Sequence, residues 1–336
     1  MTALLNVTRS VTGQKWVSRC ADDSKIAALQ SDGHSQIISN LMAGRGIAPE
    51  NADGFLNPTL RDLLPDPSTL QDIDKAAKAI LDGIAGGKSI TVFADYDVDG
   101  GTSAAQLLRW SRHIGAEFGL YVPDRIREGY GPSIKAMRAL KSGGADMVIT
   151  VDCGAAAHDA LRAAKDIDLP VVVIDHHLMH GEHPPAMALV NPNREDDTSG
   201  LGHMAAAGVT FMLLVALNRE AKRRDQSDLP DLRKFLDLAA LGTVCDVVSL
   251  TGVNRLLVTL GLKVMSARTN PGIDALARAA GLHDPSEPMD SYTCGFVLGP
   301  RINAGGRVGA AGLGSELLRS DDEARCLAIA EQLDRH

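Results

Sequence analysis

Carboxylates and imidazoles follow three apolar runs of this sequence, and together they have the chemistry of a metal site. The groups are Asp95, Asp97 and Asp99 after the first run, Asp152 after the second, and Asp175, His176 and His177 after the third. Clustered carboxylates repel one another and are costly to remove from water. Because Lys and Arg are nearly absent from these loops, divalent cations are the simplest compensation. This ligand set suits manganese, magnesium or iron better than structural zinc, and several acids permit a two-metal site.

Each of these residues also has an ordinary structural explanation. A single Asp after a strand is usually a turn or capping residue, and a lone His-His pair is usually a surface feature. Their coincidence at three strand ends favours the metal site. If the chain stays extended from Asp95 to Asp99, the alternating acids share one face. The segment Asp95–Ser103 is unlike a phosphate-binding loop, because it lacks the lysine of such loops and its acids repel phosphate.

Two downstream segments have a less specific pattern. Asp246 is the one acid inside the apolar run LAALGTVCDVVSL, where it is either a capping residue or another ligand, and spacing does not decide between them. Gly299–Arg307 is rich in glycine and arginine, which permits close backbone approach to a ligand and favours phosphate. Without the other motifs, a solvated basic turn would be the better interpretation of Gly299–Arg307.

The elements that position these residues alternate between strands and helices, which predicts an α/β fold. Strands that are apolar on both faces indicate a mostly parallel sheet with helices on both faces, and ligands then lie at the carboxyl ends of the strands. The expected strands are Ser89–Ala94, Phe118–Val122, Asp146–Val151, Pro170–Ile174 and Ala188–Val190. The expected helices between them are Thr102–Ile114, with Thr102 or Ser103 as the cap, Ser133–Lys141 and Ala155–Lys165. A helical preface precedes this region, and a helical segment follows from about residue 203.

Composition limits the classes of function. The chain has 336 residues, with 34 Lys and Arg against 42 Asp and Glu and a net charge of −8, so it is not a generally basic nucleic-acid binder. Its five cysteines form no CxxC pair, which argues against a disulfide scaffold and fits a reducing cytoplasm. The longest strongly apolar run, Phe211–Leu217, is too short to cross a bilayer, so we expect no membrane association.

The sequence resembles the DHH phosphoesterase superfamily and, within it, the RecJ single-strand-specific exonucleases. The matching segments are ADYDVDGGTSAA, IREGYGPS, VITVDCG, VIDHH, LVNPN, AAAGVTF, LAALGTVCDVVSL with NRLLV, and LGPRINAGGR. They occur in the family's order over roughly residues 40–335. The DHH signature alone indicates the superfamily, whereas GTVCDVVSL and GPRINAGGR indicate RecJ.

The resemblance implies the DHH phosphoesterase fold and a metal-dependent 5′-to-3′ exonuclease for single-stranded DNA. Such an enzyme uses two Mn²⁺ or Mg²⁺ ions to activate a water, and serves recombination and repair. By resemblance, single-strand-binding protein and a RecQ-type helicase are expected partners. The implied metal and catalytic residues are Asp97, Asp99, Asp152, His176, His177 and Asp246, with Asp95 as a further metal ligand. Asp175 would orient an imidazole, and the residues implied to hold DNA phosphate are Arg301, Asn303 and Arg307.

Relatives of this kind continue into a DHH-associated domain and an OB-like domain. We therefore expect a helical extension over residues 1–70, a catalytic domain over 71–310, and the start of a linker helix over 311–336. Without the second lobe, affinity for single strands should be low. The alternatives are a DHH phosphoesterase for short oligonucleotides or cyclic dinucleotides, a pyrophosphatase, and a truncated non-catalytic fragment.

Overall fold

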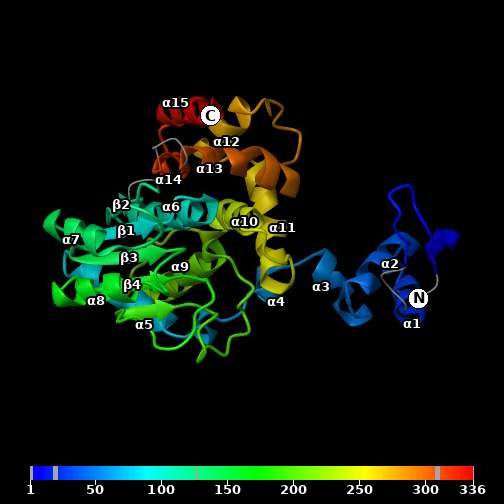
Figure 1. The fold of residues 1–336 in the computed structure, drawn as a ribbon, viewed down its shortest axis with the longest axis horizontal. Helices are drawn as coiled ribbons and strands as arrows, with labels where there is room; N and C mark the ends of the chain where they lie inside the picture. The colour runs from blue at the N-terminus through cyan, green and yellow to red at the C-terminus, as the bar shows by residue number, and fades with distance from the viewer. Residues whose placement is uncertain (1–2, 18–21, 126–127, 307–310, 336) are drawn as a thin grey trace. The chain divides into compact units, whose positions relative to one another are not determined.

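The computed structural model describes residues 3–17, 22–125, 128–306 and 311–335. The chain forms two compact units, Met1–Leu63 and Leu64–His336. Short helices make up the first unit around a small core of Leu29, Met42, Ala43 and Ala52. They are η1 (Leu4–Asn6), α1 (Asp23–Ser31), α2 (Gln36–Gly44), η2 (Pro49–Asn51), α3 (Ala52–Leu56) and α4 (Leu60–Leu63) (Figure 1).

A five-stranded parallel sheet with the order β2-β1-β3-β4-β5 is the centre of the second unit. Its strands are β1 (Ile90–Ala94), β2 (Gly119–Tyr121), β3 (Met147–Val151), β4 (Val171–Ile174) and β5 (Ala188–Val190). Ala94 pairs with Val151, Val151 with Ile174, and Ile174 with Val190, so four strands end in register. The residue after each of these strands therefore lies at the same edge of the sheet.

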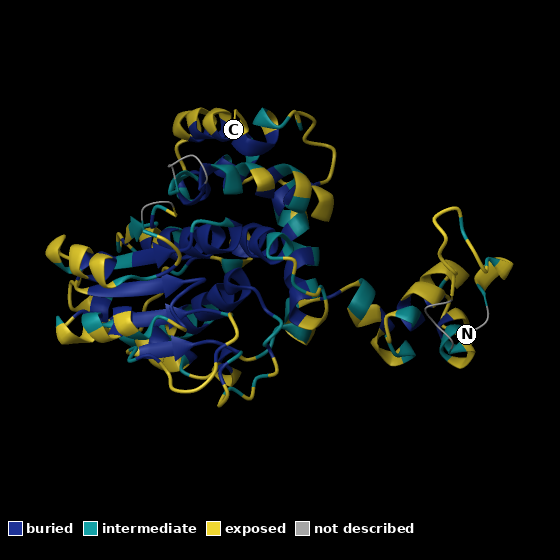
Figure 2. Ribbon diagram, viewed as in Figure 1, coloured by how far each residue is buried: buried dark blue, intermediate teal, exposed yellow. Residues whose placement is uncertain are grey.

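Helices cover the sheet on both faces, which confirms the predicted fold class. On one face, α7 (Ile134–Ser142) and α8 (His158–Asp166) share an apolar core with the strands. On the other, α5 (Ile73–Ala85), α6 (Val98–His113) and α9 (Ala206–Arg223) contact β5, β1 and β4. Strands β1, β3, β4 and β5 between these layers are almost wholly buried (Figure 2).

Later helices form a second core that includes residues of α6. The helices that contribute to this core after the sheet are α10 (Leu236–Cys245), α11 (Gly252–Ser266), α12 (Pro271–Ala279), η5 (Thr293–Leu298), α13 (Gly299–Gly305), α14 (Leu313–Arg319) and α15 (Glu323–Asp334). The unit also has two short helices outside the core, η3 (Pro67–Thr69) before the sheet and η4 (Leu232–Phe235) after it. Leu317 and Leu333, within the segment expected to begin a linker, are buried in this core. The predicted domain limits at 70 and 310 stay predictions.

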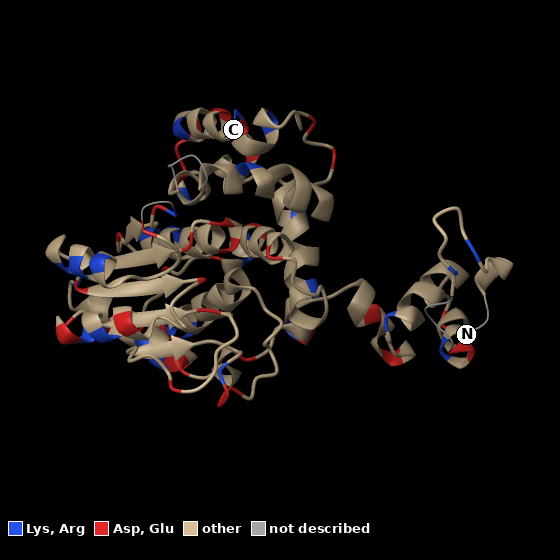
Figure 3. Ribbon diagram, viewed as in Figure 1, with Lys and Arg blue, Asp and Glu red and all other residues tan. Residues whose placement is uncertain are grey.

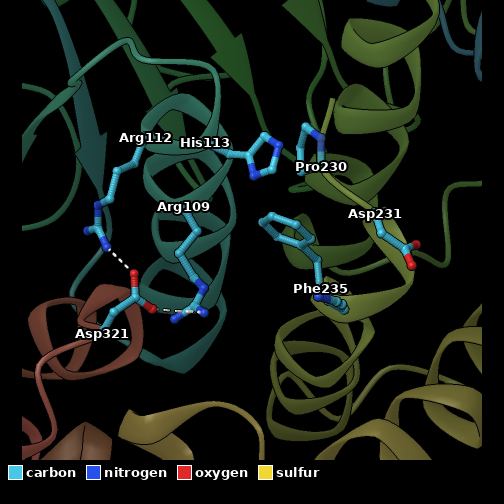
Figure 4. A pocket seen from close by; sticks show the side chains of 8 residues that line it. Arg109, Arg112, His113, Pro230, Asp231, Phe235 and Asp321 are labelled. Carbon is cyan, nitrogen blue, oxygen red and sulfur yellow. Dashed lines mark hydrogen bonds and ion pairs between the residues drawn. The ribbon is translucent and has the colours of Figure 1, made fainter. Parts of the chain in front are cut away.

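Ion pairs connect Asp321, near the start of the C-terminal helix, with two arginines of α6. Asp321, just before α15, accepts from Arg109 at 3.1 Å and from Arg112 at 2.5 Å (Figure 4). These residues line a pocket between α6 and η4, and none of the described acids at the sheet edge lines that pocket. The pairs therefore hold the helical layer in place without taking part in the acidic cluster. Among the described residues, no helix is long and apolar enough to cross a membrane.

The start of α6 differs from the prediction. The helix begins at Val98, not at Thr102, and the Asp97 side chain caps it by accepting from the Gly100 amide at 3.0 Å. A Cβ at Gly100 would collide with the Asp95 backbone, so glycine here permits close packing of helix on strand exit. The chain therefore does not stay extended from Asp95 to Asp99, so the condition under which these acids would alternate on one face of a strand is not met.

Replacing Gly261 by alanine tests the packing of α11 on α10. A Cβ at this position would collide with the Leu236 carbonyl oxygen and with Ala240. We expect Gly261→Ala to lower the free energy of unfolding by about 1–3 kcal/mol, measured by urea denaturation. Gly295→Ala is the control, since its Cβ would meet only Val244 at an ordinary 3.6 Å. Equal stability of the two variants would contradict this packing.

Candidate metal centre

Three strand exits place acids at one edge of the sheet. Asp95 follows β1, Asp152 follows β3 and Asp175 follows β4, and all three are buried. Asp152 has φ of +59°, the left-handed region that costs free energy for residues other than glycine. Such strain is held only where surrounding contacts fix it, so the turn that aims this carboxylate is a specific feature of the fold.

Three further acids reach the same place from helix ends. Asp97 caps α6, Asp99 lies in its first turn, and Asp246 caps the C-terminus of α10. The buried Asp99 carboxylate accepts from the amides of Ala206 at 2.7 Å and Ala207 at 2.8 Å, at the start of α9. The meeting of α6, α9 and α10 therefore builds half of the acidic cluster.

His176 lies at the centre of this cluster. Its Nε2 atom is 3.3 Å from Asp152 Oδ1, 3.6 Å from Asp246 Oδ2 and 3.7 Å from Asp99 Oδ2. His177 Nδ1 lies 3.9 Å from the same Asp152 oxygen. Lys and Arg are prominent on α7 and α8 instead (Figure 3). The cationic partners that touch the acids are thus imidazoles, which are also good metal ligands.

Two ligand sets meet at Asp152. The candidate sets, whose donor atoms lie within 4.8 Å of one another, are Asp95, Asp97 and Asp152; Asp152, His176 and His177; and Asp99, His176 and Asp246. Asp152 and His176 each belong to two sets. All seven residues that the sequence predicted as metal ligands are therefore brought together, and a carboxylate in the position of Asp152 can bridge two ions.

Several buried nitrogen and oxygen atoms of this cluster lack a hydrogen-bond partner among the described residues, which fits a site for a divalent cation. Within the described part of the chain, Asp95 Oδ1, Asp152 Oδ1 and His176 Nε2 are buried without a hydrogen-bond partner. Native proteins rarely leave such groups unpaired. An oxygen-rich donor set with imidazole is the kind that hard dications such as Mn²⁺ and Mg²⁺ accept.

Burial and mutual repulsion disfavour the ionised acids. Burial, with the charge of Asp97, raises the pKa of Asp95 to about 7. Burial also raises the pKa of Asp99 and Asp152 well above the usual range, reinforced by Asp246 for the first and by Asp99 for the second. The pKa of Asp246 is raised by burial as well. Bound cations would reverse this preference, since they favour the charged carboxylate.

Asp175 has a different environment from the other acids. Its carboxylate accepts from the backbone amides of Ala155 at 2.8 Å and His176 at 2.7 Å, and lies 2.7 Å from His177 Nδ1. Burial raises the pKa of Asp175, but these hydrogen bonds outweigh it and the pKa is lowered. The hydrogen bond between the Asp175 carboxylate and the His177 ring raises the pKa of His177. Asp175 thus fixes the orientation of the His177 ring through Nδ1.

Asparagines after β5 hold the backbone of the His-His pair. Asn191 donates to the His177 carbonyl at 2.9 Å, and Asn193 donates to the His176 carbonyl at 2.5 Å. Both residues belong to the segment LVNPN, which carried the resemblance without an assigned role. Their contacts supply one: they fix the direction in which the two imidazoles leave the strand.

Tyr130 is a site residue for which the sequence suggested no role. Its hydroxyl lies 3.3 Å from the Asp152 carbonyl oxygen, to which it donates, and 3.4 Å from His177 Nε2. Its ring meets His177 edge-on at 6.0 Å. The segment IREGYGPS contains it, but nothing in that local pattern says that it reaches residues 22 and 47 positions away.

Two of the predicted phosphate-binding residues make structural contacts. Arg301 pairs with Asp334 at 2.7 Å and donates to the Val297 carbonyl at 2.8 Å. The side chain of Asn303 accepts from the Val98 amide at 3.1 Å, at the start of α6. Arg307 lies outside the described residues. Their predicted role with DNA phosphate stays a prediction.

Part of the chain matches a known protein family. Residues 89–243 match the model of the DHH family, N-terminal domain. Those residues contain all the strands and most of the predicted ligands.

Several similar proteins are named as RecJ exonucleases. The chain is 35% identical to the single-stranded-DNA-specific exonuclease RecJ of Bacillus subtilis, over 96% of this chain and 39% of the relative. Its identity to RecJ of Salmonella typhimurium is also 35%, over 89% of this chain and 52% of the relative. The chain therefore spans about half the length, or less, of the curated relatives it matches.

Solved structures show the same fold. A crystal structure of exonuclease RecJ bound to manganese matches with a TM-score of 0.70 and 35% identity, covering 79% of this chain and 65% of that one. RecJ from Thermus thermophilus in complex with Mn²⁺ matches with a TM-score of 0.77 and 30% identity, covering 94% and 44%. The predicted resemblance to the DHH superfamily and to the RecJ exonucleases is confirmed.

Asp95→Asn should stabilise the metal-free protein in a pH-dependent way. Because the folded pKa is about 7 against 3.8, the folded protein loses stability as pH rises through this range, by on the order of 2–4 kcal/mol above pH 7. The amide removes that cost, so the melting temperature in EDTA should rise at pH 8 and change little at pH 4.5. The exposed Asp166→Asn is the control. An equal shift of the Asp95 variant at both pH values would contradict the assignment.

Tyr130→Phe should weaken metal binding while leaving the fold intact. The change removes the hydroxyl that supports the strained turn at Asp152, and loss of such an outer partner typically costs about 10–100-fold in metal affinity. Mn²⁺ titration calorimetry measures this. Tyr121→Phe is matched, since the Tyr121 hydroxyl bonds Glu128 instead. Equal Mn²⁺ affinities in the two variants would show that the Tyr130 hydroxyl does not support the centre.

Proposed function

We propose that this chain is a metal-dependent exonuclease of RecJ type, which hydrolyses phosphodiester bonds of single-stranded DNA from the 5′ end. The observation that carries the proposal is the position of Asp152, which belongs to two neighbouring ligand sets and has an unpartnered buried oxygen. A centre for two dications at a sheet edge is suited to phosphoryl chemistry, because it needs no protein nucleophile. The names of the relatives support DNA as the substrate.

Mn²⁺ or Mg²⁺ is the proposed cofactor, as two ions. Asp95, Asp97 and Asp152 would hold one ion, and the group of Asp99, His176 and Asp246 the other, with Asp152 between them. Bound there, the ions would lower the pKa of an attacking water and offset charge on the phosphoryl oxygens. The Mn²⁺ and Mg²⁺ complexes among the structural relatives support this choice.

The protein's own groups orient the substrate. His177 is held through Nδ1 by Asp175, so its Nε2 can donate a hydrogen bond to a phosphoryl oxygen while the imidazole carries a proton. The hydrogen bond with Asp175 raises the pKa of His177, which is the direction that favours this protonated form. This donor would stabilise the charge that develops on phosphate in the transition state. Arg301, Asn303 and Arg307 are the proposed contacts for phosphates farther along the strand.

The biological setting of the proposal comes from the relatives. We propose a role in DNA recombination and repair in the cytoplasm, with single-strand-binding protein and a RecQ-type helicase as partners. We also propose the division into an extension over residues 1–70, a catalytic domain over 71–310 and a connecting segment over 311–336. Apolar packing of α14 and α15 onto the second core supports treating that last segment as structurally tied to the catalytic domain.

Asp152→Ala should abolish hydrolysis of single-stranded DNA. It removes a carboxylate that belongs to two of the three candidate ligand sets, so activity should fall to background at every Mn²⁺ concentration. The measurement is release of mononucleotides from 5′-labelled and 3′-labelled strands during a Mn²⁺ titration, with Asp166→Asn as the control. Equal degradation by wild type and Asp152→Ala would refute the catalytic assignment. Cleavage of dinucleotides but not of long strands would instead favour a small-substrate phosphoesterase.

A further inference from the structure

Two aromatic rings lie exposed and stacked on η5. Tyr292 and Phe296 are 63% and 70% exposed, and their rings are 5.1 Å apart between centroids with planes inclined by 19°. Exposing large rings is unfavourable in water, so a paired and exposed arrangement indicates a surface that something covers. Phe296 lies in a turn of π-helix, a local geometry frequent at functional sites, and Tyr292 immediately precedes that turn.

Exposed aromatic rings are scarce in this molecule. Aromatic residues make up only 4% of the sequence. In the described part of the unit from residue 64 onward, Tyr130, Tyr292 and Phe296 are the aromatic residues with more than half of their surface exposed. Tyr130 already contacts Asp152 and His177. The placement of the other two decides whether they serve the same site.

The helix that carries the pair is attached to the acidic cluster at two points. Behind η5, the Cys245 thiol donates to the Cys294 carbonyl at 3.4 Å, and Cys245 precedes Asp246. Farther along, Asn303 of α13 accepts from the Val98 amide at the start of α6. η5 therefore packs against α10, whose C-terminus is capped by Asp246, and α13 packs against α6, whose first turn contains Asp99.

We infer that Tyr292 and Phe296 form a platform on which bases of a single strand stack while its backbone enters the metal centre. The inference rests on the proposed function and adds a binding site to it. Unpaired bases offer flat apolar faces that a duplex hides, and aromatic rings bind them with little regard to sequence. The nearby Asp290 carboxylate accepts from the Thr293 amide at 2.8 Å and hydroxyl at 3.0 Å, so it faces the helix start.

The double variant Tyr292→Ala/Phe296→Ala tests the platform with two substrates. One is 5′-phosphorylated dT12, and the other has the same phosphates but abasic sugars after the second nucleotide. For the wild type, we expect KM to be about tenfold higher for the abasic strand. For the variant, KM for dT12 should rise to the abasic value while kcat stays within about twofold. Leu327→Ala, another exposed apolar side chain, should behave as wild type.

The outcomes separate this inference from the proposed function. If the wild type degrades dT12 and the double variant has the same KM ratio between the two substrates, the platform is wrong and the nuclease stands. If the wild type is an oligomer, the double variant is not, and the KM ratio between the two substrates is unchanged, the rings form a protein interface. That result also overturns the inference. A wild type that neither binds nor cleaves dT12 in Mn²⁺ refutes the nuclease itself. Circular dichroism checks that the double variant is folded.

Discussion

Mutual repulsion among buried carboxylates is the constraint on which this structure depends. Asp95, Asp99 and Asp152 are almost wholly removed from water, and Asp97 and Asp246 lie beside them. In the absence of compensating charge, the acids must take up protons or destabilise the fold. Two imidazoles supply part of the compensation, and they are themselves metal ligands. The folded chain is therefore best satisfied when dications occupy the space between its acids.

The scaffold holds this cluster because its positions are set by backbone, not by flexible side chains. Parallel strands in register deliver three acids to one edge, and a helix start and a helix end deliver the others. Glycine permits the closest approach, since a Cβ at Gly242 would collide with Thr102 and Ala207 and lie 2.8 Å from an Asp99 oxygen. The donor atoms are thus arranged before any ligand binds, which lowers the free-energy cost of ordering them.

Local sequence was sufficient for the sheet and for the gathering of its acids. Apolar runs followed by Asp95, Asp152 and Asp175 predict parallel strands and a shared edge, because strand ends coincide in such folds. Local sequence was insufficient to predict where α6 begins, because two glycines at that point suggest a loop. There the Asp97 cap and tight packing on the strand exit favour a helix instead, and both are visible only in three dimensions.

Long-range contacts were beyond local patterns for the same reason. The contact of Tyr130 with Asp152 and the pairing of Arg301 with Asp334 join residues that no periodicity connects. Spacing alone did not decide whether Asp246 is a capping residue or a ligand, and only the family resemblance assigned it as a ligand. The structure brings it within 3.6 Å of His176. Residues at strand ends are thus readable from sequence, whereas residues that support them from other elements are not.

The most direct measurement of the central claim is the number of Mn²⁺ ions that the intact chain binds at pH 8, by calorimetry together with electron paramagnetic resonance. The account predicts two saturable sites whose spectra show magnetic coupling, because both ions would share Asp152, and a melting temperature that rises with Mn²⁺ concentration. Absence of saturable binding, or two ions without coupling and without thermal stabilisation, would contradict it.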